Sequence, residues 1–150
     1  MKLLAVASKG GHWIELQRIT GSLEKEFEVV YCSTHPGYKA VVGSNNRYYN
    51  ISDFSRWNAW RILYGYVEML KIIRSEKPSV LITTGAAPGL TALIAAKTLG
   101  IRTIWIDTIA SSMRLSASGR VAVQIADRTY TQWEELSDNK KVVYAGTIFG

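Results

Sequence analysis

Short apolar runs alternate with amphipathic runs along most of this 150-residue chain, and this alternation constrains the fold more than any other feature. Apolar runs of about 4 to 8 residues are typical of buried strands, and longer runs with helical periodicity are typical of helices. We predict strands at residues 2–8, 28–33, 80–84, 103–107, 128–131 and 142–145, with a weaker one at 47–51. We predict helices at residues 12–26, 58–75, 90–99, 116–125 and 133–137.

Strands that are apolar almost throughout, with helices between them, predict a mostly parallel sheet covered on both faces, the doubly wound α/β class. We expect one Rossmann-like domain over residues 1–150, because a chain of this length builds one ordinary core and contains no linker-like tract. Ligands of such sheets bind at the carboxyl ends of the strands. The residues that follow each strand are therefore the candidates for function.

Charge and cysteine content narrow the partners and the compartment. The net charge of +6 favours anionic partners, such as nucleotides, lipid phosphates, membrane surfaces or nucleic acid. Nucleic acid ranks last among these, because no recognition helix or aromatic RNA motif accompanies the charge. Cys32 is the only cysteine, which excludes an internal disulfide and a cysteine-based zinc site and fits a reducing cytoplasm. We expect neither a metal nor a cofactor.

Two predicted strands lead into glycine-rich loops, "SKGGH" at residues 8–12 and "TTGAAPG" at 83–89. Glycine lets the backbone approach a ligand, and free N–H groups at the start of the next helix can hold phosphate. Neither loop has the spacing of a dinucleotide site or of a P-loop. The alternative is that the glycines only permit tight turns. On the functional interpretation, one anion is bound by Ser8, Lys9, Gly10, Gly11, Thr84, Gly85 and Ala86.

Two titratable residues are candidates for catalysis. His12 stands at the start of a predicted helix, where the helix dipole disfavours imidazolium and keeps the ring able to accept a proton. We predict that His12 is a catalytic base or orients the substrate; the alternative is a helix cap or a packed side chain. Asp107 ends an otherwise apolar strand and is predicted to bind substrate hydroxyls, to orient His12 or to act as the base itself. Its alternative role is to cap the following segment.

Polar residues also follow the next two predicted strands. Arg114 and Ser116 are predicted to contact phosphate, although a solvated basic loop explains them as well. The later group, expected at a domain cleft, is predicted to contact a partner chain or a substrate, although glutamates in a first helical turn also suit the helix dipole. This group consists of Gln132, Trp133, Glu134 and Glu135.

The predicted helix at 58–75 has an apolar surface wider than one sheet-facing stripe. At its start, cations alternate with tryptophans, a composition typical of segments in the lipid headgroup region. We predict a membrane contact there, the alternative being a core helix with an aromatic edge. The residues of this predicted contact are Arg56, Trp57, Trp60 and Arg61.

Four motifs in this order resemble the asparagine-linked glycosylation fourteen-like family, whose bacterial members work in capsule and exopolysaccharide synthesis. They are "SKGGH" at 8–12, "TTGAAPG" at 83–89, "IWIDTIASSMRLSASGR" at 104–120 and "ADRTYTQWEEL" at 126–136. A more distant likeness is to the lipid-linked N-acetylglucosaminyltransferase of peptidoglycan synthesis, in which comparable glycine loops face the lipid diphosphate.

The resemblance implies the acceptor-side, amino-terminal half of a glycosyltransferase of the B fold. Such a half works with a separate chain that supplies the nucleotide-sugar domain, and the assembled inverting enzyme moves a sugar from a UDP-sugar to a lipid-diphosphate-linked saccharide. We therefore expect a peripheral protein on the inner face of the cell membrane that is inactive without its partner. The alternatives are a stand-alone enzyme that binds a nucleotide at the glycine loops, and a non-enzymatic membrane scaffold.

Overall fold

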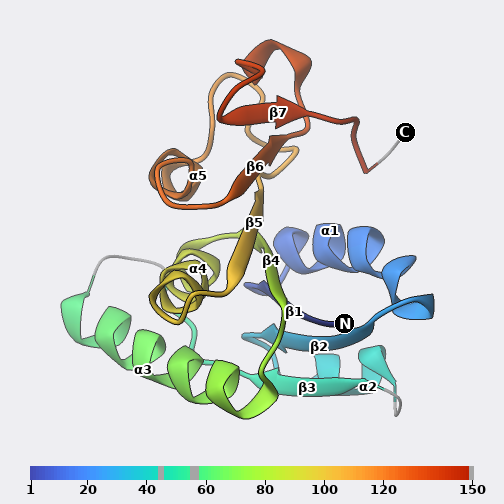
Figure 1. The fold of residues 1–150 in the computed structure, drawn as a ribbon, viewed down its shortest axis with the longest axis vertical. Helices are drawn as coiled ribbons and strands as arrows, with labels where there is room; N and C mark the ends of the chain where they lie inside the picture. Colours follow the sequence, from blue (N-terminus) through green and yellow to red (C-terminus); the bar gives the residue numbers. More distant parts are fainter. Residues whose placement is uncertain (44–45, 55–57, 149–150) are drawn as a thin grey trace.

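The computed structural model describes residues 1–43, 46–54 and 58–148. Within them, all strands join one parallel sheet in the order β3-β2-β1-β4-β5-β6-β7 (Figure 1). The strands are β1 (Lys2–Ala7), β2 (Glu28–Ser33), β3 (Arg47–Asn50), β4 (Val80–Gly85), β5 (Arg102–Ile106), β6 (Arg128–Thr131) and β7 (Val142–Tyr144). The predicted doubly wound class is confirmed.

Helices cover both faces of this sheet and form two apolar layers with it. One layer contains α1 and α2, and the other contains α3, α4 and α5, as Figure 1 shows. Their bounds are α1 (Gly11–Thr20), α2 (Tyr38–Val42), α3 (Ala59–Glu76), α4 (Ala87–Thr98) and α5 (Ala117–Ala122). Single 3₁₀ turns, η1 (Leu23–Lys25) and η2 (Glu134–Leu136), add to these helices.

The predicted strands agree with the structure to within a residue or two at each end, whereas several helices differ. Residues 12–26 do not form one helix: α1 ends at Thr20, whose hydroxyl bonds back to the Leu16 carbonyl, and Gly21 follows. Glycine disfavours continuation of the helix, and the chain resumes as η1. The predicted helix at 133–137 is only η2, and α2 is a short helix that the apolar pattern did not predict.

The order of the strands sets a topological switch point at the carboxyl edge of the sheet. From β1 the chain moves outward to β2 and β3, and then returns through α3 to place β4 on the other side of β1. The connections after β1 and β4 therefore leave on opposite sides of the sheet, which is the topological switch point where open α/β sheets bind ligands. Both glycine-rich loops lie at this point.

Candidate functional site

The two glycine-rich loops meet directly, because the Ser8 N–H donates to the Gly85 carbonyl over 3.2 Å. Each loop opens a helix, and the N–H groups of a first helical turn have no carbonyl partner within the helix. Among residues 1–43, 46–54 and 58–148, no hydrogen bond is formed by the N–H groups of Gly11, His12 and Trp13 in α1 or of Ala87 and Gly89 in α4. Two sets of unpaired backbone donors therefore lie at the switch point, and among them Gly11 is exposed whereas Trp13 and Gly89 are buried.

The His12 ring is fixed in one orientation and one tautomer. Its Nδ1 atom lies 3.0 Å from the Thr84 carbonyl oxygen, and the Thr84 hydroxyl donates back to the His12 carbonyl over 2.6 Å. A carbonyl oxygen only accepts, so Nδ1 carries the proton of the neutral ring. The lone pair of Nε2 then remains available, and Nε2 makes no hydrogen bond in the described part of the chain. This arrangement suits a proton acceptor.

Gly85 and Gly11 have different surroundings: Gly85 packs against the His12 ring, and Gly11 faces open space. A Cβ atom on Gly85 would lie 3.1 Å from His12 Nδ1, and the Gly85 φ of +115° belongs to the region that side chains rarely adopt. A Cβ atom on Gly11 would have nothing within 4 Å. Gly85 therefore leaves room for the imidazole, whereas Gly11 borders open space next to the free donors of α1.

The first residues of the "SKGGH" loop are bound by their own chain. The Lys9 N–H donates to the Thr34 hydroxyl over 2.9 Å, and the Gly10 N–H donates to the Tyr38 hydroxyl over 3.0 Å. The N–H groups of Ser8, Lys9 and Gly10 are therefore all engaged within the chain, and the unpaired backbone donors begin at Gly11, three residues after the start of the predicted anion site. The Lys9 ammonium is exposed and pairs with Asp53 at 3.7 Å.

Asp107 and Ser116 bond to each other. The buried Asp107 carboxylate accepts from the Trp105 indole over 3.0 Å, from the Ser116 N–H over 2.9 Å and from the Ser116 hydroxyl over 2.6 Å. Ser116 is in turn the N-cap of α5, its hydroxyl oxygen accepting from the Gly119 N–H. Within the described residues, Asp107 makes no hydrogen bond with the His12 ring. The cap of α5 is Ser116 and not Asp107, so Asp107 supports the cap through Ser116, and both side chains are engaged within the chain.

The buried side chain of Glu15, which sequence reasoning missed, connects three segments. Its carboxylate accepts from the Ile109 N–H over 2.8 Å, from the Thr108 hydroxyl over 3.0 Å and from the Gln132 amide over 2.8 Å. Gln132 is itself 4% exposed, so it faces the interior and not a partner surface as predicted. Glu15 is one of the inward-facing residues of α1, and a charged residue at such a position was the only sign in the sequence of its role.

The remaining predicted site residues lie at the surface of the same edge. Arg114 is exposed and, with the neighbouring Arg120, lines an open hollow of about 330 Å³ formed by residues 110–117 and 120. Trp133 is half-buried and donates through its indole to the Ile109 carbonyl over 2.7 Å. Glu134 and Glu135 are exposed in η2.

The first half of α3 exposes large apolar side chains. Trp60 is 80% exposed, Tyr64 62% and Leu63 52%, so Trp60 is not a core residue. Trp60, Arg61 and Tyr64 line a hollow of about 440 Å³ together with residues 52–54. Arg56 and Trp57 lie outside the described residues. None of the helices in the described ranges is long and apolar enough to cross a membrane.

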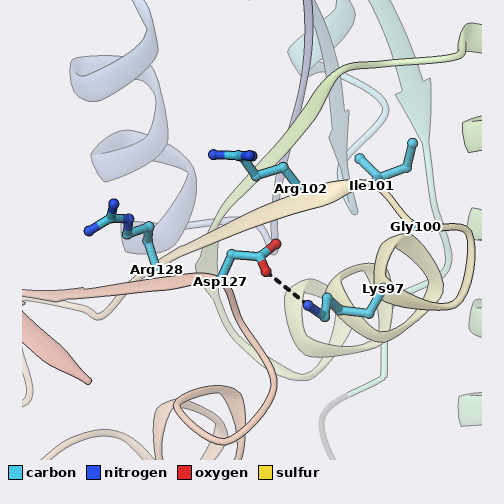
Figure 2. Close-up of a pocket in the computed structure, with 6 residues that line it drawn as sticks. All are labelled: Lys97, Gly100, Ile101, Arg102, Asp127 and Arg128. Atoms are coloured by element: carbon cyan, nitrogen blue, oxygen red, sulfur yellow. Dashed lines mark hydrogen bonds and ion pairs between the residues drawn. The ribbon is translucent and has the colours of Figure 1, made fainter. Parts of the chain in front are cut away.

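A hollow of about 460 Å³ lies at the opposite, amino edge of the sheet, where β5 and β6 begin (Figure 2). Lys97 pairs there with Asp127 at 2.9 Å, and this ammonium lowers the pKa of Asp127 below its usual range. Figure 2 shows the Arg102 and Arg128 side chains pointing to the same side, away from the ion pair. Because the glycine loops are at the other edge, this hollow does not belong to the candidate site.

A protein-family comparison matches residues 46–148 to the family described as "Oligosaccharide biosynthesis protein Alg14 like". A curated protein of Staphylococcus aureus strain MRSA252 is 27% identical over 135 aligned residues, which cover 81% of this chain and 37% of that protein. Its name is UDP-N-acetylglucosamine--N-acetylmuramyl-(pentapeptide) pyrophosphoryl-undecaprenol N-acetylglucosamine transferase. Relatives from other strains of this species match equally. The chain thus spans well under half of the curated relatives it matches.

Solved structures share the fold at low sequence identity. MurG of Acinetobacter baumannii superposes with a TM-score of 0.80 at 16% identity, over 98% of this chain and 46% of that chain. A UDP-GlcNAc 2-epimerase of Neisseria meningitidis, solved with UDP-GlcNAc bound, gives a TM-score of 0.74 at 16% identity over the same shares. The likeness shows that this chain has the architecture of about half of each enzyme, a Rossmann-like domain with a parallel sheet.

Proposed function

The chain belongs to the Alg14-like family of oligosaccharide biosynthesis proteins, and from this premise we propose that it is the acceptor-binding, membrane-recruiting subunit of a two-chain inverting glycosyltransferase. The transferred sugar comes from a UDP-sugar, and the acceptor is a saccharide linked to a lipid diphosphate. Both substrate classes appear in the name of the Staphylococcus aureus relative. The observation that carries the proposal is the orientation of His12 between two sets of free helix N–H donors.

His12 is the proposed general base. Inverting transfer requires removal of a proton from the acceptor hydroxyl as it attacks the anomeric carbon. The Thr84 carbonyl keeps the His12 proton on Nδ1, so the Nε2 lone pair can take the hydroxyl proton. The Thr84 hydroxyl also donates to the His12 carbonyl, which fixes the backbone of His12. Asp107, whose oxygens already accept three hydrogen bonds, is the second candidate.

The acceptor diphosphate is proposed to lie against the start of α1. Phosphate oxygens suit free N–H groups at the positive end of a helix dipole, and the N–H groups of Gly11, His12 and Trp13 are such donors. The second glycine loop adds the donors of Ala87 and Gly89. The exposed side chains of Lys9 and Arg114 supply positive charge at the same edge.

The apolar start of α3 is proposed to hold the protein at the membrane. Trp60, Leu63 and Tyr64 expose aromatic and aliphatic surface beside Arg61, the composition that suits a lipid interface. The Lys9–Asp53 ion pair joins the segment before α3 to the first glycine loop. A lipid acceptor in the membrane would thus present its diphosphate near that loop. We infer that the site works at the inner face of the cell membrane.

A separate chain is proposed to supply the UDP-sugar site. The domain described here aligns with 37% of the Staphylococcus aureus transferase and 46% of MurG, so an enzyme of that kind needs a second half. Glu134 and Glu135 are exposed at the carboxyl edge and are proposed to face this partner. An apolar hollow of about 280 Å³, lined by Ile106, Tyr130 and residues 145–148, is a second surface that such a partner could cover.

The test is a sugar-transfer assay with and without candidate partner chains. The purified chain, each candidate α/β partner and the mixture are incubated with UDP-sugars and a lipid-diphosphate saccharide in anionic vesicles. We expect transfer only by the mixture. Robust transfer by the isolated chain would contradict the two-chain arrangement, and tight binding of UDP by the isolated chain would favour a stand-alone nucleotide enzyme. Membrane binding with no transfer by any mixture would favour a scaffold.

A further inference from the structure

We propose that Glu15 is a positioning residue that fixes the loop at residues 108–116 against α1, and so sets the distance between the glycine loop and Arg114. The proposal rests on the acceptor-binding function argued above. The Glu15 side chain is nine-tenths or more buried, with the residue 5% exposed. Among the described residues it has no cationic partner. A buried carboxylate without a cation has to be satisfied by hydrogen-bond donors.

All the donors to Glu15 come from distant parts of the sequence. Oε1 accepts from the Ile109 N–H and from the Gln132 amide, each over 2.8 Å, and Oε2 accepts from the Thr108 hydroxyl over 3.0 Å. These residues are separated from Glu15 by 93 to 117 positions. The contacts therefore hold tertiary structure and add nothing to α1 itself.

The partners of these donors determine which way each donor points. Gln132 Oε1 accepts from the Ile148 N–H over 3.1 Å and Nε2 also donates to the Asp107 carbonyl over 3.1 Å, which fixes the amide with its nitrogen toward Glu15. The Thr108 hydroxyl oxygen accepts from the Ala110 N–H over 3.2 Å, so its own hydrogen is free to point at Glu15. Removal of the carboxylate would leave the Ile109 N–H without an acceptor.

The consequence for the site is that α1 is attached at two successive points. His12 joins α1 to the end of β4 through Thr84, and Glu15, three residues later, joins it to the segment after β5. That segment carries the exposed Arg114 and ends at Ser116. Because loops take their position from such attachments, the place of Arg114 relative to the free donors of α1 depends on Glu15.

The experiment compares Glu15→Ala with Glu15→Gln in the full chain. A glutamine keeps one carbonyl oxygen for Ile109 and Gln132, and its amide can donate to the second lone pair of the Thr108 hydroxyl. Thr108→Val is the milder companion, since it removes one donor at nearly constant volume. Glu76→Ala is the matched control, because Glu76 is equally buried but bonds Lys2, Arg47 and Tyr49 at the opposite edge.

Hydrogen exchange is measured first, because it does not depend on enzymatic activity. In Glu15→Ala we expect the amides of residues 108–116 to exchange about 10-fold faster or more, the effect of losing a hydrogen bond to a charged acceptor. Thr108→Val should give a smaller increase, and Glu15→Gln should stay within about 3-fold of the parent. Glu76→Ala should lower the melting temperature without changing exchange in this loop.

Kinetics of the assembled two-chain enzyme give the second measurement. Glu15→Ala should raise KM for the lipid-diphosphate acceptor by about 10-fold, and glutamine should restore it. Unchanged amide exchange of residues 108–116 in Glu15→Ala would overturn the proposal. Exchange in Glu15→Gln as fast as in Glu15→Ala would overturn it too. Faster exchange with an unchanged acceptor KM would also overturn it, leaving Glu15 a purely structural residue. A parental complex that transfers no sugar would refute the proposed function, whereas exchange would still test the attachment.

Discussion

The substitution His12→Asn separates the proposed chemical role of the imidazole from its structural role. An asparagine amide places an N–H donor near the position of Nδ1, so it can keep the hydrogen bond to the Thr84 carbonyl, which is 3.0 Å long in the parent. It has no counterpart of the Nε2 lone pair. Loss of a general base lowers turnover by about 10²- to 10⁴-fold, which corresponds to about 2.7–5.4 kcal/mol of activation free energy.

The structural cost should be small by comparison. His12→Ala loses one hydrogen bond, a net effect of about 0.5–1.5 kcal/mol on unfolding, or a melting temperature lower by roughly 2–4 °C for each kcal/mol. His12→Asn should melt close to the parent. Turnover is measured by sugar transfer with the partner chain at saturating acceptor. If His12→Asn keeps turnover within about 3-fold of the parent, the reasoning from the tautomer is refuted, and Asp107 becomes the leading candidate for the base.

Two further predictions test the phosphate cradle and the membrane surface. Gly11→Ala should fold normally, because its methyl group meets nothing within 4 Å, and should raise the acceptor KM. Gly85→Ala should lower kcat as well, because its Cβ would press on His12 Nδ1. Steady-state kinetics of both variants check this, and equal effects on KM and kcat in the two variants would contradict the assignment. Trp60→Ser should weaken binding to anionic vesicles about 70-fold, if half of an indole surface of roughly 200 Å² enters the interface at about 25 cal/mol per Å², and should leave the melting temperature unchanged because Trp60 is 80% exposed. Vesicle sedimentation at low and high salt measures this binding, and a parental affinity in Trp60→Ser would exclude this residue from the contact.

Features that depend on nearby residues were predictable from the sequence. The central strands β1, β2 and β4 are buried along almost their whole length because both of their faces are covered, so composition and spacing alone predicted the sheet and its class. The glycine-rich loops follow strands β1 and β4, and the parallel topology places both at one edge. Cys32 belongs to the predicted strand at 28–33, and it is fully buried, which raises the pKa of its thiol.

Features that depend on partners far along the chain were not predictable. Glu15 is one acidic residue in an amphipathic run, and only the folded chain brings residues 108, 109 and 132 to it. The same holds for Asp107, whose position at a strand end fitted catalysis and capping equally until Ser116 was seen to bond it. The short helix α2 stays marginal by itself, because so few residues rarely form a helix without tertiary contacts.

The closeness of the proposed membrane surface to the proposed catalytic site follows from topology. A helix that connects two parallel strands has to begin at the carboxyl edge, where the first strand ends, and to finish at the amino edge, where the second begins. The α3 helix makes this connection between β3 and β4, so its exposed Trp60 turn lies at the carboxyl edge with the glycine loops. The exposed Lys9–Asp53 pair shows that residue 53, which precedes α3 in the chain, lies next to the first loop. A lipid whose chain enters the interface beside Trp60 therefore has its diphosphate on the same edge as His12, with no rearrangement of the sheet required.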